Sequence, residues 1–306
     1  MLRFILRRLL VAIPTLFVII TLSFFMMHAA PGNPYDVHRK LPPEIEANVK
    51  KEYGLDKPLI VQYGNYLGGI LHGDFGPSLR NRGKTAIDIV KAGVPTSTKI
   101  GLISLILSMV IGVGLGIAAA LRQNKLTDYL ASGVAILGIC IPTFVVGPML
   151  VFAFASKLGW LPVAGVQSGL KGYILPIVVL TIPGLAGFTR LTRAGMIEVM
   201  RSNFVRTARA KGISEFQIVV RHALKPALLP MIGFFGPAVA GIVTGSLVVE
   251  KLFRLPGIGK QFYTAAIQRD YTLVMAVVIL YAALIIIFNL IGDLIQALVD
   301  PRVRFT

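Results

Sequence analysis

The chain has 306 residues, of which 55% are hydrophobic and 15% are charged, and its mean hydropathy is +0.75. Soluble domains carry about 25% charged residues, so the composition excludes an ordinary soluble protein and indicates an integral membrane protein. A single cysteine, Cys140, excludes a disulfide framework and a multi-cysteine metal site. The formal charge of +17 does not indicate nucleic-acid binding, because no basic stripe is interleaved with base-stacking aromatic residues.

Six apolar runs are long enough to cross a lipid bilayer. A hydrocarbon core about 30 Å thick needs roughly 20 residues of helix, and long unbroken runs favour helices over a β-barrel. The sequence therefore predicts an all-α integral membrane protein with six transmembrane helices. The runs are 9–30, 100–121, 130–156, 173–189, 227–249 and 273–298.

Three of these runs have features of their own. The first begins like a signal peptide, but its apolar stretch is longer than the usual ~7–15 residues, so we interpret 1–30 as an uncleaved transmembrane helix. Pro142 and Pro148 predict a kink in the third run. The fourth is the shortest and contains Pro176 and Pro183.

Lys and Arg in the short loops set the orientation. With the N-terminus inside, the cytoplasmic pieces hold 15 Lys and Arg in 61 residues, whereas the outer loops 157–172 and 250–272 hold six in 39. Six spans then place both termini in the cytoplasm. Cationic loops that face an anionic leaflet account for most of the net charge.

The segment 31–98 is expected to form a small folded cap outside the membrane, with a helical stretch over 44–53. Gly83-Lys84-Thr85 resembles the end of a phosphate-binding loop, but that motif requires glycine at position 78, which is Ser78 here. The rest of the chain, 99–306, is expected to form the core with five further helices.

The largest inside loop, 190–226, carries eight bases and two acids. Its apolar residues fall close to helical spacing, and the helix is expected to stop at Gly212, a left-handed cap. Ser214 and Gln217 have the spacing of a capping box that starts a second helix, which runs toward Lys225. An inert connector needs only a few residues, so the length favours a function. The apolar residues are Ile197, Met200, Phe204, Val205 and Ala208.

Polar residues within spans are functional candidates. Asn289 and Asp293 lie in the sixth run. Asp293 is expected either to pair with a basic loop residue, such as Arg302 or one from 190–226, or to contact the substrate. Glu250 and Lys251 lie at the outer end of the fifth run, ahead of a turn-rich loop, and are expected to mark the membrane interface.

Small residues and one tryptophan in or beside the spans have expected structural roles. Gly112, Gly114 and Gly116 predict close helix contact. Cys140 is expected to pack as a small apolar residue, and Trp160 to anchor the chain at the interface.

The loop 206–230, RTARAKGISEFQIVVRHALKPALLP, resembles the cytoplasmic EAA loop of ABC-importer permeases. In that pattern Gly212 is the glycine, Ala208 the last alanine and Leu224 the leucine. Arg206 and Thr207 depart from the usual Glu and Ala, and His222 and Lys225 from the usual Ile and Pro, but these departures are the form typical of the peptide and nickel branch. Further blocks that resemble this branch are LRFILRRLLVAIPTLFVI, APGNP, YGLDKPLIVQYGNYL, GDFGPSL, PGIGK and DPRVRF.

The closest resemblance is to the first permease subunit of an oligopeptide importer; dipeptide, glutathione and nickel relatives share nearly all of these blocks. The resemblance implies the type I importer fold and ATP-driven import from periplasm to cytoplasm of a bacterial inner membrane. It also implies a homologous second permease, two cytoplasmic ATPases that bind ATP and Mg²⁺, and a periplasmic peptide-binding protein. The chain contains no Walker motif and no cofactor, metal or catalytic motif.

The resemblance implies that an ATPase docks on this loop and moves it as a lever around Gly212, with Ala208 at the contact. The basic residues Arg206, Arg209 and Lys211 are expected either to pair with acids of the ATPase or to face anionic lipid. The predicted coupling residues are Arg206, Thr207, Ala208, Arg209, Lys211, Gly212, Ser214, Glu215 and Leu224.

Two other classes of protein remain as alternatives. A secondary transporter that acts alone would favour internal repeats and acids at the midplane, and only Asn289 and Asp293 are deep polar residues. An enzyme acting on lipid would need a clustered acid–base or metal set near one interface, and none is visible.

Overall fold

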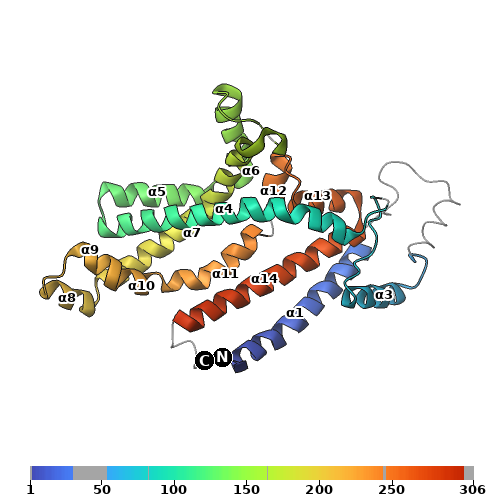
Figure 1. Cartoon of the computed structure of the whole chain (residues 1–306), viewed down its shortest axis with the longest axis horizontal. Coiled ribbons are helices and arrows are strands. Elements are labelled where there is room, and N and C mark those ends of the chain that lie inside the picture. Colours follow the sequence, from blue (N-terminus) through green and yellow to red (C-terminus); the bar gives the residue numbers. More distant parts are fainter. Residues whose placement is uncertain (1, 30–53, 82, 164, 244–245, 300–306) are drawn as a thin grey trace.

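A computed structural model describes residues 2–29, 54–81, 83–163, 165–243 and 246–299, and the described residues form helices with no strand (Figure 1). The helices lie side by side in an elongated bundle, with α8 and α9 at one end and α3 and α13 at the other. The elements are α1 (Leu2–Ala29), α3 (Leu59–Leu71), α4 (Ala86–Leu121), α5 (Leu126–Cys140), α6 (Thr143–Leu150), η1 (Val151–Lys157), η2 (Val166–Tyr173), α7 (Ile174–Met200), α8 (Asn203–Ala210), α9 (Glu215–Gln217), η3 (Ile218–Ala223), α10 (Leu224–Ala227), α11 (Leu229–Val243), α12 (Leu247–Leu252), α13 (Ile258–Gln268) and α14 (Tyr271–Val299).

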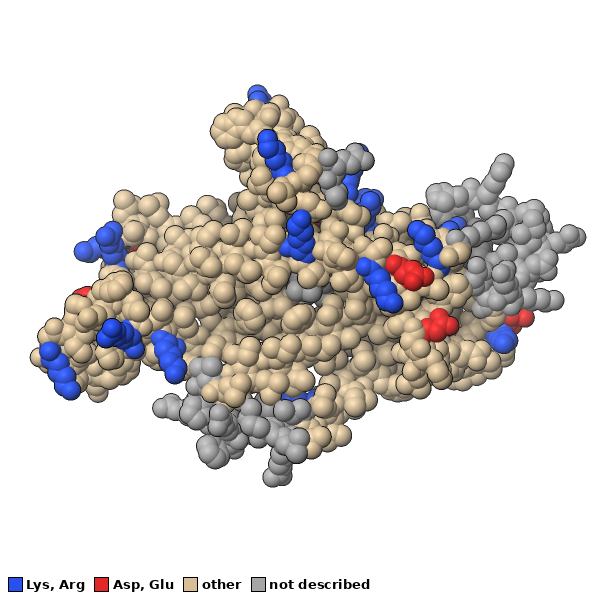
Figure 2. All heavy atoms as spheres, in the orientation of Figure 1, with Lys and Arg blue, Asp and Glu red and all other residues tan. Residues whose placement is uncertain are grey.

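Four helical stretches of the described chain are long and apolar enough to cross a membrane. They are Leu6–Ala29 in α1, Ala86–Leu121, which is α4, Ser168–Met200, which includes α7, and Tyr271–Leu298 in α14. Two further stretches qualify only as bent pairs: α5 with α6 and η1, and α9 through α10 with α11. The count is therefore four, or six if each bent pair is one span. Charged side chains lie mostly toward the two ends and on the projecting α6 segment (Figure 2).

The third predicted span is broken where its first proline lies. The axis turns by 106° between α5 and α6, and Ile141 and Pro142 at the break have extended backbone angles. Proline restricts the preceding residue to such angles, so the expected kink at Pro142 is confirmed. As a result, α6 and η1 project sideways from the bundle (Figure 1).

Several boundaries differ from the sequence expectation. α7 runs through Pro183 to Met200, so 190–200 extends the fourth span rather than beginning a loop. α4 starts at Ala86, capped by Thr85, inside the segment assigned to the outer cap. The segment 250–272, predicted to be an outer loop, contains part of α12 and all of α13. The stretch 44–53 lies outside the described residues.

The central contact of the bundle is between α4 and α7. A Cβ atom at Gly112 would lie 2.7 Å from the Cβ of Phe188, and one at Gly116 would lie 2.6 Å from the Cβ of Thr192. These two glycines therefore permit close approach, as predicted. Gly114 has no atom within 4 Å, so the same expectation is wrong for this residue.

Two residues with expected structural roles, Cys140 and Trp160, lie on the exposed surface of the chain. Cys140 is exposed rather than packed. Trp160 is also exposed, and its ring lies 5.9 Å from that of Phe154.

Candidate functional site: the coupling loop and its neighbouring charges

The predicted coupling loop leaves the bundle where α7, the helix of the fourth span, ends. α7 ends at Met200, and Ser202 has the extended angles of an N-cap before α8. The expected single helix from Ile197 to Ala208 is therefore two helices, because the chain turns at Arg201 and Ser202. This turn lets α8 change direction relative to α7.

Gly212 forms the turn between the two loop helices. Its φ is +74°, in the left-handed region that glycine adopts without steric cost. Its N–H donates to the carbonyl of Arg209 at 2.9 Å, and the N–H of Ile213 donates to that of Ala208 at 3.3 Å. Ser214 Oγ then accepts from the N–H of Gln217. The predicted glycine cap is therefore present, and so is the half of the predicted capping box that Ser214 supplies.

Arg209 and Glu215 face each other across this turn. Arg209 Nε donates to Glu215 Oε1 at 2.5 Å and Nη2 donates to Oε2 at 3.2 Å. Hydrogen bonding to Glu215 raises the pKa of Arg209 further, so the guanidinium stays charged. Arg209 is therefore already paired within the chain, whereas it was expected to serve an ATPase acid or lipid.

Ala208 faces the inside of the loop. It is 7% exposed and lies in a buried cluster with Val205 and Ile218. Its small side chain therefore permits close approach of α8 to η3, and its methyl group does not form the outer surface. The exposed residues of the predicted set are Arg206, Thr207, Arg209, Lys211, Gly212, Ser214 and Glu215.

Leu224 lines a groove of about 810 Å³ beside the loop. One side of the groove is the last turns of α4, with Ile117 and Leu121. The other side is α9 and η3, with Phe216 and Val220. Phe216 is 77% exposed. The loop thus presents basic side chains and a large aromatic ring to its surroundings.

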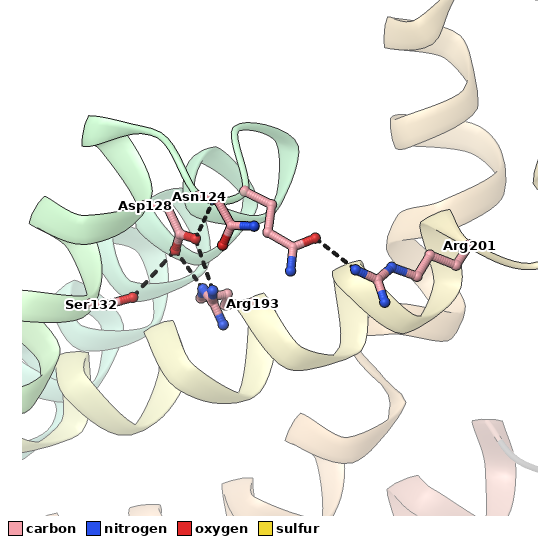
Figure 3. Close-up of polar contacts among 6 residues, drawn as sticks. Asn124, Asp128, Ser132, Arg193 and Arg201 are labelled. Carbon is pink, nitrogen blue, oxygen red and sulfur yellow. Dashed lines mark hydrogen bonds and ion pairs between the residues drawn. The ribbon is translucent and has the colours of Figure 1, made fainter.

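An ion pair between the buried Asp128 and the partly exposed Arg193 joins α5 to α7 close to this loop (Figure 3). Arg193 Nε and Nη2 donate to the two oxygens of Asp128 at 2.5 and 2.8 Å. Asp128 also accepts from the N–H of Asn124 at 3.0 Å and from Ser132 Oγ at 3.3 Å. Sequence reasoning missed this pair; the available signal was one acid just before the third apolar run and one base just after the fourth.

The predicted polar residues of the sixth span have separate environments. Asp293 Oδ2 lies 3.0 Å from Nη1 of Arg8, so its ionic partner is in the first span and not in 190–226; Arg302 lies outside the described residues. Asn289 packs against Gly236 of α11, and its Oδ1 is buried with no hydrogen-bond partner among the described residues. The structure does not bring these two residues to the coupling loop.

Glu250 is fully buried, and it is not an interface marker as expected. Its carboxylate accepts from Ser97 Oγ at 2.6 Å and from the N–H of Lys260 at 3.0 Å, while Ser97 accepts from the N–H of Ile258 at 2.8 Å. Burial raises the pKa of Glu250, and these hydrogen bonds oppose that change. The two side chains cap α13, and Gly257 leaves room for the carboxylate.

Similarity to known proteins decides the family. Residues 112–305 match the family described as binding-protein-dependent transport system inner membrane component, and residues 1–82 match its N-terminal family. The chain belongs to this family of permeases. The resemblance stated from the sequence is confirmed, and the permease is a multi-pass protein of the inner-membrane type.

Two relatives illustrate the similarity. The permease is 51% identical over 306 residues to the oligopeptide transport system permease protein OppB of Salmonella typhimurium, with full coverage of both chains. It is 39% identical over 304 residues to the dipeptide transport system permease protein DppB of Bacillus subtilis, covering 99% of this chain and 98% of the relative.

The fold also matches a solved transporter. An inward-facing MetNI methionine ABC transporter structure aligns with a TM-score of 0.59 and 19% identity, covering 70% of the permease and 97% of that chain. This confirms the type I ABC-importer permease fold. Within the described residues no group of three or more His, Cys, Asp or Glu could hold a metal ion.

Proposed function

We propose that this permease forms half of the membrane pathway of an ATP-driven oligopeptide importer, paired with a second, similar permease. The full-length similarity to an oligopeptide permease carries the proposal. In this proposal the permease crosses the membrane six times, with each bent helix pair as one span. Both termini lie in the cytoplasm, and residues 31–98 face the periplasm. Separate ATPases bind ATP and Mg²⁺ and dock on the coupling loop, and a periplasmic binding protein delivers the peptide.

The geometry of the loop supports the docking role. Two short helices joined at Gly212 directly follow α7, the long helix of the fourth span. A force on the loop is therefore transmitted to α7. The exposed residues of the loop include Arg206 and Lys211, and a cytoplasmic partner with acidic side chains would complement them. The same role for dipeptides, glutathione or nickel is the alternative, which the similarity to a dipeptide permease keeps open.

Purification and transport measurements test the proposal. A tagged permease isolated from its own membranes should carry two ATPase subunits and a second permease. Vesicles containing that assembly should take up labelled tri- to pentapeptides only with ATP and the binding protein, and dipeptides, glutathione and Ni²⁺ serve as comparison substrates. Proton-driven uptake by this chain alone would overturn the proposal.

A further inference from the structure

The start of α5 and the turn before it are attached to the C-terminal part of α7 at two points (Figure 3). The first is the bidentate pair of Asp128 and Arg193. The second is Arg201, whose Nη2 donates to Gln123 Oε1 at 3.0 Å. Arg193 and Arg201 are eight residues apart, which is about 12 Å along a helix. Two separated contacts hinder rotation of the turn about either one.

The second contact lies where α7 ends and the coupling loop begins. Arg201 caps the end of α7, and the next residue, Ser202, begins the turn into α8. A displacement of α8 therefore acts first on the part of α7 that holds the α4–α5 turn. From there α5 leads directly to the break at Pro142 and to the projecting α6.

The pair of Asp128 and Arg193 is suited to fixing geometry. The side chain of Asp128 is 3% exposed and that of Arg193 is 31% exposed. A buried ion pair adds little net stability over apolar residues, but loss of one partner leaves an uncompensated charge. A planar guanidinium bound at two oxygens also fixes the orientation of both helices.

We propose that Asp128 and Arg193 are positioning residues, which make the inner end of α5 move as one body with α7 and the coupling loop. This inference rests on the proposed ATP-driven function. It assigns the pair the task of transmitting the motion of the loop to the third span, beyond the docking contact itself.

We call the paired Asp128 and Arg193 the clamp. The ratio of peptide imported to ATP hydrolysed, measured in vesicles that contain the complete transporter, tests its role. Asp128→Asn should lower this ratio about tenfold, within the usual range of coupling between sites, while the ATPases remain bound. Arg193→Lys keeps the charge but loses the planar group that donates to both carboxylate oxygens, and it should have an intermediate effect on the ratio. Ser132→Ala, which removes only the 3.3 Å donor to the same carboxylate, is the matched control and should keep the wild-type ratio.

A distance measurement in a chain with both clamp residues intact covers the case in which the variants do not assemble. Spin labels at Lys125→Cys and Ala194→Cys, both exposed positions, in a chain whose exposed Cys140 is replaced by serine, should keep the same separation in the nucleotide-free and ATP-bound transporter. A change of more than about 5 Å, the rise of one helical turn, or a normal transport ratio in Asp128→Asn, would overturn the clamp. A wild-type assembly without ATP-dependent uptake would instead contradict the proposed function.

Discussion

Arg209 in α8 and Glu215 in α9 form a two-point ion pair across the turn at Gly212, with nitrogen–oxygen distances of 2.5 and 3.2 Å. The pair and the left-handed glycine close the same turn from opposite sides: one through side chains, the other through the backbone. The bend of the loop is therefore built from residues within seven positions of one another.

The backbone at Gly212 should be the more critical of the two features. Gly212→Val places a β-branched side chain at a φ of +74°, where such residues are strongly disfavoured. The protein should still insert into the membrane but lose peptide uptake. Gly212→Asn is the matched variant, because asparagine tolerates this region, and it should retain most of the uptake. Normal uptake by the valine variant would remove the turn from the mechanism.

The Arg209–Glu215 pair should contribute little to stability. Both side chains are substantially exposed, and exposed ion pairs typically contribute up to about 1 kcal/mol. Glu215→Gln should therefore change the free energy of unfolding by less than about 1 kcal/mol, and the change should disappear at high salt. Thermal unfolding of the purified transporter at low and high salt measures this. A larger loss that persists in high salt would mean that the pair supports more than the turn.

Removal of the Glu250 carboxylate should destabilise the end of the bundle that holds α13. Glu250→Ala leaves Ser97 Oγ and the N–H of Lys260 without their buried acceptor. This should cost about 2–4 kcal/mol, because unpaired buried donors pay their full desolvation penalty. Glu250→Gln keeps an acceptor oxygen and should lose roughly half as much. Unfolding midpoints of the two variants give the comparison, and equal stability of Glu250→Ala and wild type would contradict the capping role.

The contact between α4 and α7 can be tested with two neighbouring glycines. Gly116→Ala places a methyl group 2.6 Å from Thr192 Cβ and 2.8 Å from the carbonyl oxygen of Thr189. Relief of this contact requires a backbone shift, which should cost about 1–3 kcal/mol. Gly114→Ala meets no atom within 4 Å and should leave stability unchanged. The unfolding midpoints of both variants, measured in the same detergent, decide this; equal values would argue against the close packing.

Local features of the loop could be predicted because they depend on a few adjacent residues. The Gly212 cap and the break at Pro142 follow from backbone angles that glycine and proline permit or impose. The Ser214 cap follows from a side-chain oxygen within reach of the backbone N–H three residues on. The role of Ala208 could not be predicted in this way. Its methyl group faces Ile218, ten residues along the chain, because the turn folds the second helix back onto the first.

The environments of the charged residues also depended on packing. Asp293 was expected to pair with Arg302 or with a base of 190–226, yet its ionic partner is Arg8. Glu250 was expected at the interface, yet it is buried against Ser97 of α4. Neither partner is marked by spacing, because the contact joins helices more than 150 residues apart in the sequence.

The sequence by itself determined that the chain is an all-helical membrane protein, where its apolar runs lie and which family its blocks resemble, since hydropathy and short motifs are local properties. Only the tertiary structure decided that α7 continues unbroken to Met200, that Gly116 is packed while Gly114 is open, and that Asp128 meets Arg193. These features depend on which faces of distant helices come together. An apolar run specifies that a helix is buried in lipid or protein, but it does not specify which neighbour the helix will touch.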